Sequence, residues 1–198
     1  MVVIGITGNI GSGKSSVCQV LVRLGAIAID ADELAHEAYK PHSQAWREII
    51  DTLGSSILKP DGEIDRQELG RMVFSRPDAL KQLNQIVHPR AYHLAEEKIA
   101  CHRRLGAKAI ALEATLLIEA GWTSMVDKTW LVIAPDAAVI QRVRAKQKLE
   151  RPQILARLKA QMPAEEKMKY ADEVIYNDGD LKQLESRVAG LWSKLNAA

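Results

Sequence analysis

Near its N-terminus the chain places a glycine-rich segment between an apolar run and a helical pattern, and this arrangement constrains the fold more than any other. The apolar run is Val2–Thr7, and Gly8-Asn9-Ile10-Gly11-Ser12-Gly13-Lys14-Ser15 follows it directly. The spacing Gly-x-x-x-x-Gly-Lys-Ser is that of a P-loop, which holds the phosphates of a nucleoside triphosphate. Chance would produce this spacing in such a chain on the order of one time in a hundred. With a strand before it and a helix after it, we interpret the segment as functional.

Each residue type in this loop has a physical role in holding phosphate. Glycine adopts backbone dihedrals closed to other residues, so successive N–H groups can point at one anion. The helix that begins at Gly13-Lys14 adds its unpaired N–H groups and the positive end of its dipole. Lys14 supplies a point charge to the β- and γ-phosphates, and the Ser15 hydroxyl can bind Mg²⁺. The predicted nucleotide-binding residues are Gly8, Gly11, Ser12, Gly13, Lys14, Ser15 and Ser16.

Four further apolar runs alternate with longer helical patterns. None of the five runs alternates cleanly between apolar and polar residues, as expected for strands that are covered on both faces. A helix from Lys14 to about Leu24 separates the first two runs, which implies a right-handed crossover and a mostly parallel sheet. We therefore expect an α/β fold with five strands. They are Val2–Thr7, Ala26–Ile29, Ala107–Leu112, Thr129–Ala134 and Glu173–Tyr176.

Two helical stretches interrupt this alternation. Residues 32–105 contain no convincing strand and are too many for a simple crossover, so we expect them to form a helical subdomain. Residues 136–171 form the second stretch, and a final helix is expected from about Leu181 to Leu195. The core of a single domain is then about residues 1–31, 106–135 and 172–198. Breaks within the first stretch are expected at Pro41, Gly54, Pro60-Asp61-Gly62, Pro77 and Pro89.

Acidic residues follow two of the expected strands. Asp30 and Asp32 end the second strand, where the carboxyl ends of parallel strands line a ligand crevice. A carboxylate there can accept a proton from an attacking hydroxyl or hold Mg²⁺ through water. The alternative is a capping box, because Glu33 follows Asp30 by three residues. Glu113 closes the third strand as a candidate Walker-B-type acid, with a surface or helix-capping carboxylate as its alternative.

The second helical stretch carries a basic segment over residues 141–151. Such a run is usually a solvated helix face, but in a phosphoryl-transfer enzyme a basic lid neutralises charge on the γ-phosphate and excludes water. Arg142 and Lys146 are four residues apart and would share one helix face. His88 precedes Pro89 at an apparent helix start, and alone it favours a structural role.

Composition excludes several classes of protein. The chain has 198 residues, 47% hydrophobic and 26% charged, which indicates a globular domain rather than a disordered one. A net charge of +2 is too small to suggest a nucleic-acid coat. Cys18 and Cys101 form no metal-binding pattern and are expected to be reduced thiols. With no stretch of eighteen apolar residues and no signal-peptide pattern, we expect a cytoplasmic protein with no membrane span.

Several blocks of the sequence resemble the dephospho-CoA kinase family, in the family's order and over almost the whole chain. The opening residues 4–16 are similar to that family's N-terminus, which usually has Gly-Gly where Gly8-Asn9 stands here. The block around His88-Pro89 is similarly telling. The remaining blocks are Asp30-Ala31-Asp32, Leu116-Leu117-Ile118-Glu119, Gln161-Met162-Pro163 with Glu165-Glu166-Lys167, and Ala171-Asp172-Glu173-Val174-Ile175-Tyr176-Asn177.

This resemblance implies a three-layer P-loop kinase fold with a helical substrate-binding insertion and a helical lid. It also implies transfer of phosphate from ATP, with Mg²⁺, to the ribose 3′-hydroxyl of dephospho-CoA. Asp32 becomes the base or hydroxyl-orienting acid, His88 a substrate-binding residue, and Lys14 and Arg142 catalytic residues. We expect a monomer, with a small homo-oligomer as the alternative, and no nucleic-acid partner.

Two departures from the family pattern affect these roles. The family's Asp-Ile-Pro-Leu-Leu block reads Glu113-Ala114-Thr115-Leu116-Leu117 here, which leaves the role of the third-strand acid open. Lys146 stands where the family often has arginine; lysine keeps the charge but loses the bidentate fork, so we favour Arg142 as the lid residue.

Alternative functions share the phosphate loop. Shikimate- and gluconate-type kinases also pair it with an acid after the second strand, and a non-kinase NTPase is a more distant alternative. A GTPase would need an Asn-Lys-x-Asp motif, which the sequence lacks. A nucleic-acid binder would need a concentrated basic face, and only residues 141–151 offer one.

Overall fold

Five parallel strands form one sheet in the order β2-β3-β1-β4-β5 in a computed structural model that describes residues 1–147 and 149–197. Every neighbouring pair of described strands is parallel, so the predicted α/β fold is confirmed. The strand predictions are also confirmed, with ends that differ by two residues at most. The strands are β1 (Val2–Thr7), β2 (Ile27–Asp30), β3 (Ala109–Glu113), β4 (Lys128–Ile133) and β5 (Glu173–Tyr176).

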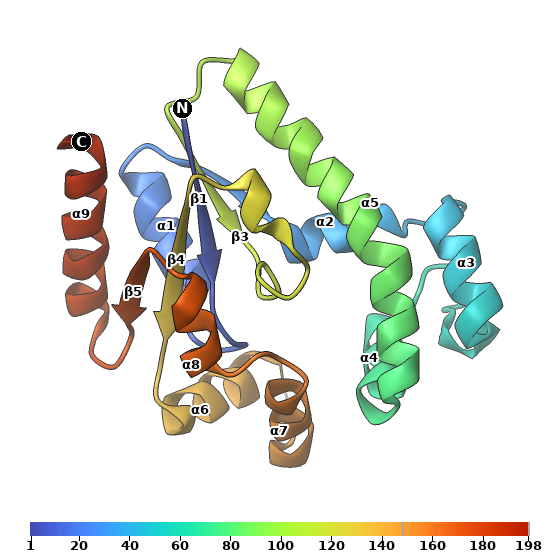
Figure 1. Ribbon diagram of the computed structural model, residues 1–198. Coiled ribbons are helices and arrows are strands. Elements are labelled where there is room, and N and C mark those ends of the chain that lie inside the picture. Colours follow the sequence, from blue (N-terminus) through green and yellow to red (C-terminus); the bar gives the residue numbers. More distant parts are fainter. Residues whose placement is uncertain (148, 198) are drawn as a thin grey trace. The chain divides into compact units, whose positions relative to one another are not determined.

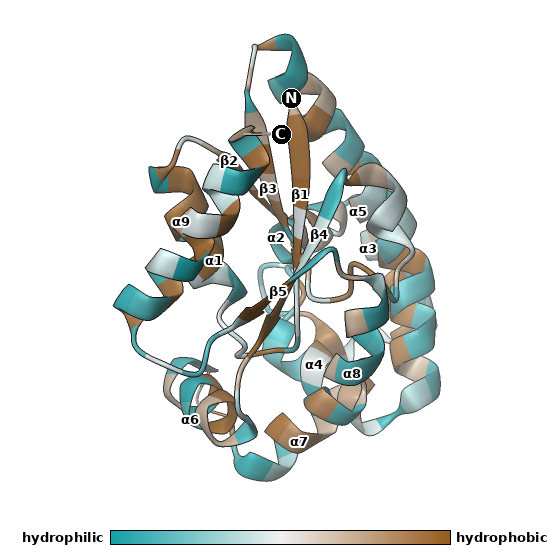
Figure 2. Ribbon diagram, turned by 60° about the vertical axis from the view of Figure 1, so that its left-hand side comes forward, coloured by the Kyte–Doolittle hydropathy of each residue, from teal (hydrophilic) through white to brown (hydrophobic). Residues whose placement is uncertain are grey.

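The chain divides into two compact units, one made of Met1–Asp30 with Lys98–Ala198 and the other of Ala31–Glu97. The first unit contains the whole sheet. Its helices α1 (Lys14–Arg23) and α9 (Leu181–Ala197) lie side by side and pack on the strands (Figure 2). Apolar residues recur along α1 at helical spacing and meet β1 and β4 in a core that buries Val17, Leu21, Ile4 and Trp130. Burial of this core holds the start of α1, and the loop before it, against the sheet.

Three helices of the first unit follow β4 and lie beyond the carboxyl ends of β1 and β4 (Figure 1). They are α6 (Asp136–Gln147), α7 (Arg151–Lys159) and the short α8 (Ala164–Lys167). Val139, Val143 and Ile154 form a buried apolar cluster, and Ile10 of the glycine-rich loop packs against it. The expected lid therefore has a core of its own that includes one loop side chain. Two 3₁₀ turns complete the unit, η2 (Trp122–Met125) and η3 (Met168–Tyr170).

The second unit is helical and has a separate hydrophobic core that includes Ile49, Ile57 and Val73. Side chains cap two of its helices: the Ser43 hydroxyl accepts from the Trp46 N–H, and Asp65 accepts from two N–H groups of α4. Its elements are α2 (Ala31–Ala38), α3 (Gln44–Leu53), η1 (Ser55–Ile57), α4 (Arg66–Ser75) and α5 (Pro77–Arg104), the last of which crosses into the first unit.

The expected helix break at Pro89 is wrong, because α5 continues through this residue and His88 lies inside the helix rather than at its start. Proline lacks an N–H and removes one helical hydrogen bond. In this helix the side chain of Arg90 donates to the carbonyl of Ile86 (2.6 Å) and also pairs with Glu48 at 2.8 Å. Val87 and Ala91, on either side of the proline, are buried. The packing of these two neighbours and the ion pair between Arg90 and Glu48 therefore help to hold the helix across the proline.

Candidate phosphate-binding site

Three glycines of the loop after β1 adopt positive φ angles, 141° at Gly8, 76° at Gly11 and 104° at Gly13. Space is as restrictive as backbone conformation. A Cβ atom on Gly8 would lie 2.2 Å from the Val132 carbonyl oxygen, and one on Gly13 would lie 2.1 Å from the Asn177 amide nitrogen. Glycine is therefore required twice over, by dihedral angle and by close approach of β4 and of the chain after β5.

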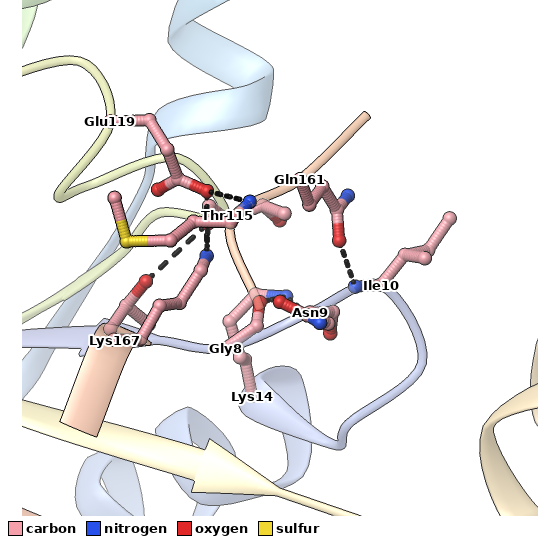
Figure 3. A network of polar contacts seen from close by, with 10 residues as sticks. Gly8, Asn9, Ile10, Lys14, Thr115, Glu119, Gln161 and Lys167 are labelled. Atoms are coloured by element: carbon pink, nitrogen blue, oxygen red, sulfur yellow. Dashed lines mark hydrogen bonds and ion pairs between the residues drawn. The ribbon is translucent and has the colours of Figure 1, made fainter. Parts of the chain in front are cut away.

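Lys14 is the first residue of α1 and is almost fully buried, with 6% of its surface exposed. Its ammonium group donates to the carbonyl oxygens of Gly8 (2.9 Å) and Asn9 (3.3 Å). These two contacts hold the positive charge across the loop, next to the N-terminal N–H groups of α1 (Figure 3). A buried ammonium and a helix N-terminus at one place form a strong anion-binding site.

Ser12 sits where the loop meets two residues from distant parts of the chain. Its carbonyl oxygen accepts from the Asn177 side chain at 2.7 Å and from the Arg142 guanidinium at 3.4 Å. Arg142 also reaches the Asn177 side-chain oxygen at 3.5 Å. Among the described residues, the buried hydroxyl of Ser12 has no hydrogen-bond partner in the protein. A buried hydroxyl costs free energy unless it is hydrogen-bonded, so this oxygen fits a loop built to hold a phosphate.

Sequence patterns did not single out Asn177 as a site residue. It directly follows β5, is buried, and bonds to the loop across 165 positions of sequence. The usable sequence signal was its position: a polar residue right after a parallel strand lies at the edge where ligands bind.

Ser15 and Glu113 lie together at the carboxyl end of the sheet. The Ser15 hydroxyl donates to the Glu113 carboxylate at 2.8 Å. Strand register places Asp30 beside Glu113, since the ends of β2 and β3 pair directly. A hydroxyl and carboxylates are the oxygen donors that Mg²⁺ prefers. In residues 1–147 and 149–197 no group of three or more His, Cys, Asp or Glu side chains could hold a metal. In proteins Mg²⁺ is commonly bound by one or two carboxylates together with substrate phosphates.

Cys18 lies one turn after Lys14 in α1, and its side chain hydrogen-bonds to Glu113. Burial, with a smaller contribution from the Glu113 charge, raises the pKa of the Cys18 thiol far above its usual range. The thiolate is the reactive form of cysteine, so this side chain stays a neutral, unreactive thiol. Cys101 is also a free thiol.

The remaining predicted residues divide between the two units. Ser16 lies in the first turn of α1, and Lys146 is exposed on α6 while Arg142, on the same helix, touches the loop. Asp32 lies in the first turn of α2, and His88 lies within α5, both in the second unit. The structure thus brings together Lys14, Ser15, Glu113 and Arg142 within the first unit.

Comparison with known proteins shows which family this chain resembles. A family model described as dephospho-CoA kinase matches residues 2–183. The dephospho-CoA kinase of Geobacter sulfurreducens is 45% identical over 98% of both chains. A crystal structure of a Thermus thermophilus protein has a TM-score of 0.79 at 40% identity, covering 98% of this chain and 97% of its own. The dephospho-CoA kinase of Campylobacter jejuni has a TM-score of 0.71 at 26% identity, covering 98% and 96%.

One further property concerns membranes. Within the described part of the chain, no helix has the length and apolar character that a bilayer crossing requires.

Proposed function

The chain belongs to the dephospho-CoA kinase family and is a phosphotransferase of the last step of coenzyme A synthesis, and on that basis we propose how its residues carry out the transfer. The reaction moves the γ-phosphoryl group of ATP to the ribose 3′-hydroxyl of dephospho-CoA and yields coenzyme A and ADP. Family membership selects this substrate over the shikimate- and gluconate-type alternatives considered from the sequence. The single observation that supports the chemistry best is the buried Lys14 ammonium held across the loop at the start of α1.

The transfer needs positioning and charge neutralisation more than covalent chemistry. The 3′-hydroxyl oxygen attacks the γ-phosphorus, and the bond from that phosphorus to the bridging oxygen breaks, so that ADP leaves with the electron pair. The amides of the loop and Lys14 neutralise the triphosphate on one side, and Arg142 neutralises charge developing on the transferred group. Asp32 accepts a hydrogen bond from the attacking hydroxyl and takes its proton.

Arg142 is suited to this role by its contacts. Its guanidinium reaches the Ser12 carbonyl and the Asn177 side chain at 3.4 Å and 3.5 Å, which are long hydrogen bonds. Such bonds orient the side chain at the loop while leaving most of its donor capacity for phosphate oxygens. His88 is proposed as a contact to dephospho-CoA in the helical substrate-binding region, residues 32–105, and residues 136–171 are proposed as the lid.

Mg²⁺ is the metal that the Ser15 hydroxyl and the Glu113 carboxylate would hold, Glu113 as the Walker-B-type acid. When bound, the ion supplies positive charge to the phosphate oxygens and lowers the repulsion that an attacking hydroxyl meets. Lys14 contributes the complementary charge from the protein and does so without a metal. We further propose that the enzyme works in the cytoplasm as a monomer, without a nucleic-acid partner.

A coupled assay tests the proposal. ADP release from ATP is measured with dephospho-CoA, shikimate and gluconate as separate acceptors at the same concentration. We expect stimulation by dephospho-CoA alone, and coenzyme A as the product in mass spectrometry. Stimulation by shikimate or gluconate with none by dephospho-CoA would contradict the assignment and leave triphosphate binding by the loop intact.

A further inference from the structure

Residues 161–167, which lead from α7 through α8 towards β5, connect two loops at the carboxyl edge of the sheet. At one end, the side-chain oxygen of Gln161 accepts a hydrogen bond of 3.0 Å from the backbone N–H of Ile10 (Figure 3). Ile10 belongs to the phosphate loop, where backbone N–H groups bind the ligand. The proposed function assigns no role to Gln161 or to Lys167, although both lie in a block of family resemblance.

Lys167 anchors the other end of this segment and is fully buried, with 0% of its surface exposed. Its ammonium group pairs with the Glu119 carboxylate at 3.0 Å and donates to the Thr115 carbonyl oxygen at 2.8 Å. Thr115 and Glu119 both lie in the loop that follows β3, two and six residues after Glu113. Lys167 therefore fastens the segment to the loop that follows the candidate metal-binding acid.

Glu119 transmits this anchoring to Gln161. The carboxylate oxygen that pairs with Lys167 also accepts from the backbone N–H of Met162 at 3.0 Å. Met162 is the residue after Gln161, so its amide fixes the backbone from which the Gln161 side chain extends. An unbroken series of contacts then runs from Thr115 through Lys167, Glu119 and Met162 to Gln161 and Ile10 (Figure 3).

A role in stability alone does not explain why this series of contacts includes charged side chains. Burial lowers the pKa of Lys167, against the opposing effect of Glu119, so the charged form of this side chain is less favoured here than it would be in water. Apolar residues of similar size often replace a buried ion pair with no loss of stability, so a stability role gives little reason to retain charge here. The charged pair does something that an apolar pair cannot: it presents an acceptor to the Met162 amide.

We propose that Lys167 and Gln161 are positioning residues of the nucleotide site, with Lys167 orienting Glu119 and Gln161 holding the Ile10 N–H so that the phosphate loop keeps its binding shape. The role rests on the proposed kinase function but concerns nucleotide binding rather than the acceptor. Gln161 holds the Ile10 N–H from outside the loop, while the Ser12 N–H donates to the Asn9 carbonyl within it, so the two contacts together set the shape of the loop backbone. Loss of the Gln161 contact should therefore lower the affinity for nucleotide more than it lowers kcat.

Gln161→Ala tests the Ile10 end, with Glu165→Ala as its control, since Glu165 is exposed in the same segment. Affinity for ADP is measured by calorimetry, which needs no acceptor and is therefore independent of the identity of the substrate. We expect the dissociation constant for ADP and the KM for ATP to rise roughly threefold to tenfold, the scale of one lost hydrogen bond. The kcat and the KM for dephospho-CoA should stay within about twofold of the parent's values on the same scale. Unchanged ADP affinity in Gln161→Ala overturns the proposal.

Lys167→Met and the double variant Lys167→Met/Glu119→Leu test the buried end and separate positioning from stability. The single variant leaves the partly exposed Glu119 carboxylate without its lysine partner and should lower both the thermal midpoint and the ADP affinity. The double variant removes both charges and should recover the midpoint, while its ADP affinity stays at least about threefold below the parent's because the Met162 N–H has lost its acceptor. Recovery of affinity together with the midpoint means a structural role only and overturns the proposal for Lys167. If the Lys167 variants do not fold, the Gln161→Ala result decides the proposal.

Discussion

The Ser15 hydroxyl donates a 2.8 Å hydrogen bond to the carboxylate of Glu113, and so joins the first turn of α1 to the end of β3. These residues are 98 positions apart, and the strand order places β3 directly beside β1. The contact brings together the two oxygen donors that we propose for Mg²⁺.

Glu113→Gln should raise the Mg²⁺ concentration for half-maximal activity by about 10-fold to 100-fold, the range seen when a partner of a metal site is removed. The amide keeps an acceptor for Ser15 but removes the negative charge. Activity is followed in a Mg²⁺ titration at fixed ATP, with Glu185→Gln as control because Glu185 lies on α9 in a surface ion pair with Arg23. If Glu113→Gln requires the same Mg²⁺ concentration as the parent, Glu113 does not bind the metal.

Asp32→Ala should cut turnover by roughly 100-fold or more, the scale of a lost general base, and leave ATP binding intact. Binding is measured by calorimetry and turnover by ADP release. Glu33→Ala is the matched control, since both acids lie in the first turn of α2 and affect that helix's dipole alike. Equal activities in the two variants would mean that Asp32 supports only the helix.

Arg142→Ala should lower kcat/KM for ATP by about 100-fold, the loss typical of a group that stabilises transition-state charge. Arg142→Lys should be intermediate, because lysine keeps the charge and loses the planar fork. The control is Arg144→Ala on the same helix, whose side chain is exposed. A similar decrease in both alanine variants would indicate a general effect of charge on α6 and would contradict a specific role for Arg142.

Gly13→Ala should lower the free energy of unfolding by roughly 1–3 kcal/mol and abolish measurable nucleotide binding. The added Cβ would lie 2.1 Å from the Asn177 amide nitrogen, and φ at this position is 104°. Gly190→Ala is the opposite case, since Gly190 lies in α9 with open space around its Cβ direction and should gain up to about 1 kcal/mol. Urea unfolding of both variants measures the difference, and a stable Gly13→Ala that binds ADP would contradict this account of the loop.

Tyr39 should make stability fall with rising pH in the alkaline range. Burial raises the pKa of the Tyr39 hydroxyl from 10.0 to about 12. The neutral form is favoured in the folded state, so its contribution is fully present below pH 10 and is lost as the pH rises towards 12. The free energy of unfolding, measured in urea at pH 9 and pH 11, should decrease more for the parent than for Tyr39→Phe. Equal decreases would show that Tyr39 titrates alike in both states.

Local patterns were enough to predict the strands and the loop. Each strand is a short apolar run that is bounded by residues unsuited to a buried strand. The loop is recognised by the spacing of its glycines, which adopt dihedral angles that other residues adopt only with strain. The same local reasoning failed at Pro89, where Arg90 and Glu48, 42 positions apart, help sustain a helix that the proline would otherwise weaken.

The amino-acid sequence alone was sufficient to identify the phosphate loop, the α/β alternation and the charged residues from which a kinase site could be built. Which of those residues meet was decided by tertiary structure: Ser15 with Glu113, Asn177 with Ser12, and Lys167 with Glu119. These pairs depend on strand order and on burial, which are properties of the whole packed chain. A carboxylate or an ammonium has the same appearance in sequence whether it faces solvent or a buried partner, and only packing distinguishes the two.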